Sequence, residues 1–164
     1  DKQFMDYYVG QKEVAVTGKI EGVEFKGKID CLNVEKGYFV DIKTTKSDID
    51  SMVWVQDEAS GRNIQVRWFE AWGYVLQMAA YKKMLEDQYG KEFTPVIYAV
   101  TKEPTPDTRA IVFQTQEKLG YELTELSMLI KRLDKVKRGE EKAKPCGHCE
   151  YCKTKALSQR VEVI

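Results

Sequence analysis

Gly27-Lys-Ile-Asp30 and Asp41-Ile-Lys43 are the two short segments that decide the fold and the chemistry of this chain. Around them apolar and polar residues alternate, and this period of two predicts β-strands rather than helices. The turn residues Glu35-Lys-Gly37 separate the two segments, so we expect an antiparallel hairpin that carries both of them. The predicted strands cover residues 13–20, 23–33 and 37–44.

A regular turn brings acidic side chains together on this hairpin. Asp30 then lies opposite Asp41, with Cβ atoms about 5 Å apart, whereas a glycine bulge at Gly37 would shift the register by one. Lys43 follows Asp41 by two residues and therefore projects from the same face. Two carboxylates on a hairpin suit Mg²⁺ or Mn²⁺, and the lysine could orient water or stabilise charge at phosphorus. A solvated surface hairpin is the alternative, because 32% of the residues are charged.

The rest of the chain alternates between helical and strand patterns. Apolar residues in steps of three and four predict a helix over about 63–89, and residues 45–62 are expected to form a loop with a short helix. A buried strand is predicted at 95–101, a further strand at 109–115 and a second long helix at about 116–138. This order is typical of an α/β or α+β sandwich.

Gln77 and Tyr81 form a polar pair on the first predicted helix. They are four residues apart, so they lie on the same face, at the edge of the apolar stripe. From that position they can contact both the core and a neighbouring cleft. An ordinary boundary pair between core and solvent is the alternative.

Composition limits the classes of function. The 164 residues include 26 Lys+Arg and 26 Asp+Glu, and this balance excludes a broadly basic DNA-coating surface but not a local charged pocket. The length fits one domain, which we divide into a core over 1–144 and a cysteine-containing tail over 145–164 packed on it. No apolar run approaches the roughly 18 residues that span a bilayer, and no signal peptide is visible, so we expect a cytoplasmic protein without a membrane partner.

The three motifs, taken in order, resemble those of RecB-type nucleases in the PD-(D/E)xK superfamily. That series has a Gly-x-x-Asp strand, an (Asp/Glu)-x-Lys strand and a Gln-x-x-x-Tyr helix, and here it spans about residues 13–115. Phage and prophage exonucleases of the RecE (exonuclease VIII) and YqaJ type are the most similar members. The resemblance implies a restriction-endonuclease-like core, in which two long helices flank a mixed β-sheet with antiparallel hairpins.

The resemblance also implies a function and a set of site residues. It implies a Mg²⁺- or Mn²⁺-dependent double-strand DNA exonuclease of phage recombination, with a single-strand annealing protein as partner and a homo-oligomeric assembly. Asp30, Asp41 and the backbone carbonyl of Ile42 would bind the metal ion, and Lys43 would be the catalytic lysine. Gln77 and Tyr81 would support the substrate and the active site.

Two departures from the pattern concern the acidic ligands. Asp41 stands where glutamate is commoner, which shortens the reach to the metal. Similar proteins carry an acidic or histidine residue in an earlier helix, so we expect a missing N-terminal element. Glu13 is a candidate extra ligand, although a strand-edge glutamate is the simpler interpretation. DNA contacts could come from four residues near the hairpin, or these could belong to a solvated loop: Lys46, Trp54, Arg62 and Arg67.

Three of the four cysteines lie close together in Cys146-Gly-His-Cys149-Glu-Tyr-Cys152. This spacing can hold three corners of a tetrahedral Zn²⁺ site or an iron–sulfur cluster, with His148 as an awkward fourth ligand. Reduced thiols on a C-terminal helix are the alternative, and Cys31 is expected to be a buried core thiol. Two other functions therefore remain open. One is an iron–sulfur RecB-type nuclease of the AddB or CRISPR-adaptation sort, and the other is a non-catalytic nucleic-acid-binding module with a cysteine-bound metal.

Overall fold

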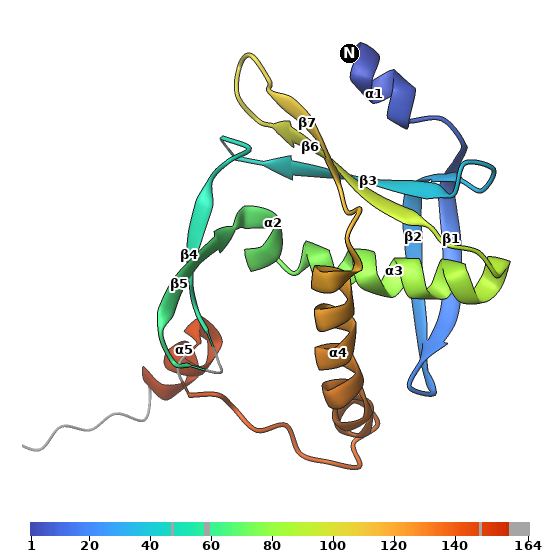
Figure 1. The fold of residues 1–164 in the computed structure, drawn as a ribbon. Helices are drawn as coiled ribbons and strands as arrows, with labels where there is room; N and C mark the ends of the chain where they lie inside the picture. The colour runs from blue at the N-terminus through green and yellow to red at the C-terminus, as the bar shows by residue number, and fades with distance from the viewer. Residues whose placement is uncertain (47, 58–59, 148, 158–164) are drawn as a thin grey trace, which may run out of the picture. The chain divides into compact units, whose positions relative to one another are not determined.

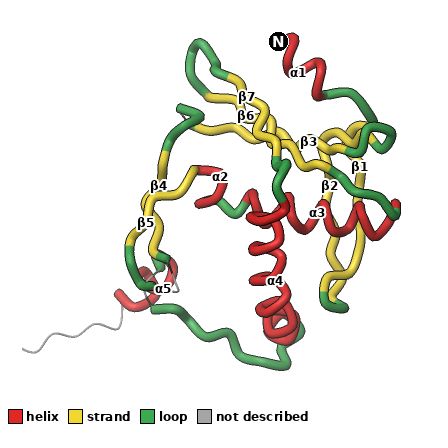
Figure 2. The backbone as a smooth tube through the Cα atoms, viewed as in Figure 1, coloured by secondary structure: helices red, strands yellow, loops and turns green. Residues whose placement is uncertain are grey.

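The computed structural model describes residues 1–46, 48–57, 60–147 and 149–157 (Figures 1 and 2). The chain divides into two compact units, Asp1–Ile130 and Lys131–Ile164. The first unit contains the sheet and both acidic motifs, and the second contains the three neighbouring cysteines. The predicted packing of residues 145–164 on the core stays a prediction.

A five-stranded mixed sheet forms the centre of the first unit, in the order β1-β2-β3-β6-β7 (Figure 1). Only β3 and β6 pair in parallel, and the other neighbours in this sheet are antiparallel. The predicted strands and the α/β class are confirmed. The strands are β1 (Gln11–Ile20), β2 (Val23–Asn33), β3 (Tyr38–Thr45), β6 (Thr94–Thr101) and β7 (Thr108–Val112).

The hairpin between β1 and β2 turns at two residues, Glu21 and Gly22, which both have positive φ, 50° and 81°. A two-residue turn of this kind matches the right-handed twist of the flanking strands. It sets one register for the two strands, from Ile20 opposite Val23 to Gln11 opposite Leu32, with no ladder pair at Glu13 and Asp30. The register of β2, which carries Asp30, is therefore fixed from its first residue.

Helices cover both faces of the sheet. α3 (Tyr74–Tyr89) packs on one face, where its apolar side chains form the largest core cluster with residues such as Phe39 and Ile97. α1 (Lys2–Tyr7) packs on the other face against Val40 and Tyr98. α4 (Gln116–Lys137) confirms the second long helix, and within the first unit its apolar stripe contacts α3 and the β1–β2 hairpin. Asp41 and Lys43 lie on the α3 face, because they alternate with Val40 and Ile42 along β3.

The prediction of one helix over 63–89 was wrong at its start. Residues 63–67 form β5 (Asn63–Arg67), which pairs with β4 (Met52–Gln56) in a separate two-stranded sheet. The expected loop over 45–62 therefore contains a strand as well. In both segments β-branched residues alternate with other residues, as in strands, and each strand provides hydrogen-bond partners for the backbone of the other. The helical pattern of the residues that follow concealed this strand pattern.

The helical part of that segment is itself interrupted. α2 (Trp68–Ala71) ends after one turn, and Gly73 separates it from α3 with a left-handed φ of 69°. This break makes Tyr74 the first residue of α3 and places its side chain at the helix end near the sheet. No helix among the described residues is long and apolar enough to cross a membrane.

Candidate functional site

The acidic motifs lie where β2 and β3 separate. Cys31 and Val40 form the last pair of this ladder, and Asp30 and Asp41 are the next residues on the two strands. Beyond this pair, the side chain of Asp30 provides the hydrogen-bond acceptor between the two strands, because its Oδ2 accepts a hydrogen bond of 2.6 Å from the Ile42 N–H. The register is the regular one, without a glycine bulge, so the structure brings the two aspartates together as the sequence predicts.

Asp41 is a buried carboxylate, with 3% of its surface exposed. Burial raises the pKa of this carboxyl above its usual range, the ammonium of Lys43 opposes the shift, and the charge of Asp30 adds to it. Its Oδ2 forms an ion pair with the Lys43 ammonium, yet within the described part of the chain this oxygen accepts no hydrogen bond of acceptable geometry. In this structure the positive charge that faces the buried oxygen is the Lys43 ammonium.

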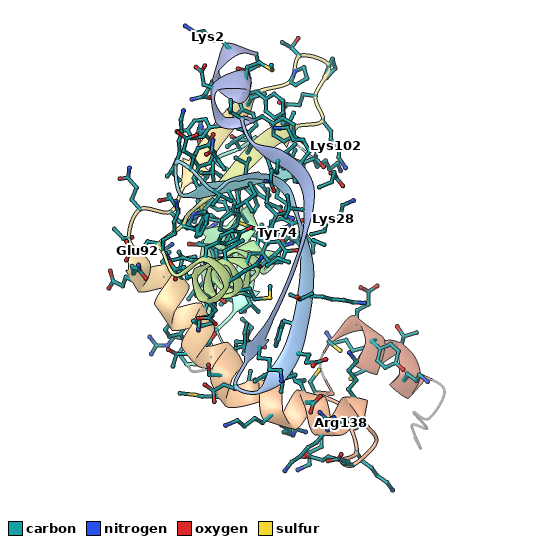
Figure 3. All side chains as sticks on the ribbon, turned by 90° about the vertical axis from the view of Figure 1, so that its right-hand side faces the viewer. Lys2, Lys28, Tyr74, Glu92, Lys102 and Arg138 are labelled. Carbon is teal, nitrogen blue, oxygen red and sulfur yellow. The ribbon has the colours of Figure 1, made fainter. Side chains whose placement is uncertain are left out.

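Lys43 is held between a carboxylate and an aromatic ring. Its Nζ lies 4.5 Å from the centroid of the Tyr74 ring, in a cation–π contact. Tyr74 in turn packs edge-on against Trp68, with 5.9 Å between the ring centroids. Figure 3 shows Tyr74 among the closely packed side chains beside the sheet. The sequence analysis missed Tyr74, although Gly73 was a signal that a helix could begin there.

Gln77 and Tyr81 lie on α3 and contact each other, since the Gln77 Nε2 donates a hydrogen bond of 2.9 Å to the Tyr81 hydroxyl. The Tyr81 ring lies over Gly27 of β2, where an added Cβ would come 2.2 Å from Cε1 of the ring. Gly27 therefore leaves the space that Tyr81 occupies. The Tyr81 ring can pack at this position because the residue three places before Asp30 is a glycine.

Arg109 is a further basic residue on this face of the sheet. Lys43 pairs with Ala99 on β6, and Ala99 pairs with Arg109 on β7, so the three residues form one row. Two strand spacings separate the ends of the row by about 10 Å. The Arg109 guanidinium donates to Asp50 over 2.7 Å, and that of Arg67 donates to the same oxygen over 2.9 Å. The sequence analysis missed Arg109 because the row depends on the strand order.

Glu13 does not join the two aspartates. It lies on β1 between Lys12 and Val14, which pair with Cys31 and Ile29, and it has a φ of 55°. Its carboxylate forms an ion pair with Lys28 of the neighbouring strand, which is labelled in Figure 3. Among the described residues, no three acidic groups lie within metal-ligand distance of one another. The simpler interpretation of Glu13, a strand-edge glutamate, fits this arrangement, because β1 is an edge strand of the sheet.

The four residues named as DNA-contact candidates do not form one cluster. Trp54 and Arg67 share a face of the β4–β5 ribbon, because Arg67 pairs with Met52, which lies two residues from Trp54 on the same strand. Trp54 is 66% exposed, which is unusual for a tryptophan, and Arg67 is bound to Asp50. Lys46 and Arg62 lie in exposed loops at the two ends of this region.

The cysteines divide as the sequence predicts. Cys31 is fully buried in the core between the sheet and α1. Cys146, Cys149 and Cys152 belong to the second unit, where their Sγ atoms all lie within 4.8 Å of one another. Cys149 directly precedes α5 (Glu150–Leu157), and Cys152 lies in its first turn. His148 lies outside the described residues.

The sheet order, the paired aspartates with Lys43 and the helix that covers them define a PD-(D/E)xK-type nuclease fold. The chain belongs to the family described as "PDDEXK-like domain of unknown function (DUF3799)", which matches residues 1–155. The restriction-endonuclease-like core is thereby confirmed.

Solved structures that are similar to this chain include the following two. A protein from Eubacterium rectale described as a "Putative exonuclease" is 32% identical, with a TM-score of 0.79 over 100% of this chain and 57% of its own. This chain thus spans little more than half of that protein. The structure of SSO0001 is 14% identical, with a TM-score of 0.45 over 95% of this chain and 63% of its own. No curated protein matches the chain.

Proposed function

We propose that this chain is a Mg²⁺- or Mn²⁺-dependent deoxyribonuclease that hydrolyses phosphodiester bonds as an exonuclease on duplex DNA. The observation that carries the proposal is the state of Asp41. It is a buried carboxylate beside a second aspartate, and its Oδ2 forms an ion pair with Lys43. The pKa of Asp41 stays raised although the Lys43 ammonium opposes the shift, so a further cation beside the two carboxylates would stabilise their charged forms.

The available donors fit a hard divalent ion. They are a carboxylate oxygen of Asp41, the oxygen of Asp30 that does not bind the Ile42 N–H, and the carbonyl of Ile42, all oxygen atoms of the kind that Mg²⁺ and Mn²⁺ prefer. When bound there, the ion would neutralise phosphate charge and lower the pKa of a water molecule. The hydrogen bond from Ile42 fixes the orientation of Asp30 before any ion arrives.

The other residues of the chain would position the reactants. The Lys43 ammonium, restrained by Asp41 and the Tyr74 ring, can orient the attacking water and stabilise negative charge at phosphorus. Gln77 and Tyr81 hold α3 against β2 through Gly27 and would support this arrangement. Trp54 would stack on a base, while Lys46, Arg62 and Arg67 would contact phosphates.

The exonuclease mode is supported by the description of the similar Eubacterium rectale protein. The resemblance to RecE-type enzymes supports a role in phage or prophage recombination in the cytoplasm, with a single-strand annealing protein as partner and a homo-oligomeric assembly. These finer assignments belong to the proposal, and each depends on the chain being a nuclease.

The test is hydrolysis of linear duplex DNA in the presence of Mg²⁺. We expect Asp41→Ala and Lys43→Ala proteins to lose activity, while Lys83→Ala, which removes an exposed ion pair with Asp87 on α3, retains it. An exonuclease degrades linear but not closed circular duplex. Equal activity of the Asp41→Ala and wild-type proteins would refute the assignment. DNA binding without cleavage by the wild-type protein would favour a non-catalytic module instead.

A further inference from the structure

The second unit contains a group of side chains that the proposed hydrolysis does not use. Cys146, Cys149 and Cys152 form no disulfide bond, and the first two are exposed and the third is partly buried. Their sulfur atoms converge on one point although the chain has six residue steps from the first to the last. Soft sulfur donors select Zn²⁺, Cu⁺ or iron–sulfur chemistry and not the Mg²⁺ of the acidic site. We propose that these three thiolates bind a single tetrahedral Zn²⁺ ion.

The distances between the sulfur atoms favour one ion over an iron–sulfur cluster. A Zn–S bond of about 2.3 Å gives a tetrahedron whose sulfur atoms are about 3.8 Å apart. The Sγ atoms of Cys146 and Cys152 are 3.8 Å apart, and every pair in the group lies within 4.8 Å. Thiolates that bind different irons of a cluster are separated by the iron–iron distance as well, so they lie farther apart. One central ion can reach all three sulfurs of this group.

The backbone around the sulfurs is arranged as it is in a metal-binding turn. The Cys149 N–H points to the Cys146 Sγ over 3.4 Å, and the Cys152 N–H points to the Cys149 Sγ over 3.5 Å. Gly147, with a φ of 80°, lets the chain turn between the first two cysteines. N–H groups directed at sulfur stabilise the negative charge of a metal-bound thiolate, so the turn is organised for thiolate ligands before the ion binds.

The ion would fix the start of α5. Cys149 directly precedes this helix and Cys152 lies in its first turn, while Cys146 belongs to the preceding loop. A bond from each sulfur to one ion ties that loop to the helix, which has eight residues and would be marginal alone. The described residues supply three ligands, so a water molecule would complete the tetrahedron around the ion.

Elemental analysis of the full chain, purified without chelator, tests this proposal. We expect about one zinc per chain, and loss of most of it in each of the Cys146→Ser, Cys149→Ser and Cys152→Ser proteins. Cys31→Ala and Glu150→Gln are the controls and should retain the zinc, because Cys31 lies in the core and Glu150 is not in the sulfur group. Replacement of zinc by Co²⁺ should give the strong visible absorption of a tetrahedral cobalt–thiolate site, which a misfolded protein would not show.

Three results would overturn the proposal. They are iron with acid-labile sulfide in a brown protein, zinc retained by the triple cysteine variant, or wild-type protein that contains no metal and binds neither Zn²⁺ nor Co²⁺. The zinc content of the protein does not depend on whether the acidic site hydrolyses DNA. Asp41→Ala protein should keep its zinc, and its DNA hydrolysis is measured separately, so the failure of one proposal leaves the other standing.

Discussion

The ring of Tyr81 lies so close to Gly27 that any side chain at that glycine would overlap it, with only 2.2 Å between an added Cβ and the ring Cε1. A helix residue thus occupies the space that a side chain would need on a strand residue 54 positions earlier, three residues before Asp30. The contact links the packing of the core to the geometry of the candidate site.

Gly27→Ala should therefore destabilise the protein by about 1–3 kcal/mol, because the Tyr81 ring must move and its hydrogen bond with Gln77 is disturbed. Urea denaturation measures the change. Gly120→Ala is the matched control, because Gly120 lies within α4 and has no atoms within 4 Å of the added Cβ. There the same substitution should stabilise the helix by about 0.5–1 kcal/mol. Equal effects at the two positions would contradict the close contact.

Asp41→Asn should raise the melting temperature of the metal-free protein at neutral pH. The pKa of Asp41 is raised in the folded state, mainly by burial, so its ionised form costs stability above that pKa and the cost disappears as the pH falls through it. The difference from wild type should therefore shrink on acidification from about pH 8 to about pH 4. Each kcal/mol corresponds to about 2–4 °C for a chain of this size.

The same variant should lose stabilisation by Mg²⁺ or Mn²⁺. A metal ion that binds only the folded state raises the melting temperature of the wild-type protein in proportion to the logarithm of its concentration. Asp87→Asn removes an exposed carboxylate of α3 and should keep the full response. A metal response that Asp41→Asn retains would place the ion elsewhere.

Tyr74→Ala should lower kcat more than it raises KM, because the ring restrains Lys43 rather than binding the substrate. A cation–π contact of about 0.5–2 kcal/mol corresponds to a loss of about two- to thirtyfold. Tyr74→Phe retains the ring and should recover most of the activity. If the phenylalanine variant is as slow as the alanine variant, the hydroxyl rather than the ring is the important group.

Arg109→Ala should weaken DNA binding without sequence preference. Arg109 lies in the same row as Lys43, about two strand spacings away, so it can meet a phosphate next to the one being cleaved. Loss of one phosphate contact should reduce the slope of log K against log salt by about 1. Binding is measured with Ca²⁺ in place of Mg²⁺, and Lys83→Ala controls for the change in net charge. An unchanged slope would exclude Arg109 from the interface.

The parts of the fold that could be predicted from the sequence are those that depend on neighbours along the chain. The β2–β3 hairpin follows from alternation and a short turn, and the same local rule places Asp30 next to Asp41. Gln77 and Tyr81 follow from helical spacing. The β4–β5 ribbon was missed because the apolar steps of α3 extend in the sequence into β5, and a pattern alone does not show that Gly73 interrupts the helix.

The residues that complete the candidate site could not be predicted in this way. The contact of Tyr74 with Lys43 joins the first residue of a helix to a strand 31 positions earlier. Arg109 reaches the same face only because β6 lies between β3 and β7. Both relationships depend on how distant elements pack, and neither residue type is unusual at its own position.

The parallel pairing of β3 with β6 also determines when the candidate site can form as the protein is made. Asp41 and Lys43 lie opposite Ile97 and Ala99, so the strand that carries them has no partner on that side until the ribosome has passed Thr101. Pairing across so many residues closes a large loop and is slow compared with a hairpin. A nascent chain that ends before β6 therefore has both aspartates but not the strand that completes the sheet around them.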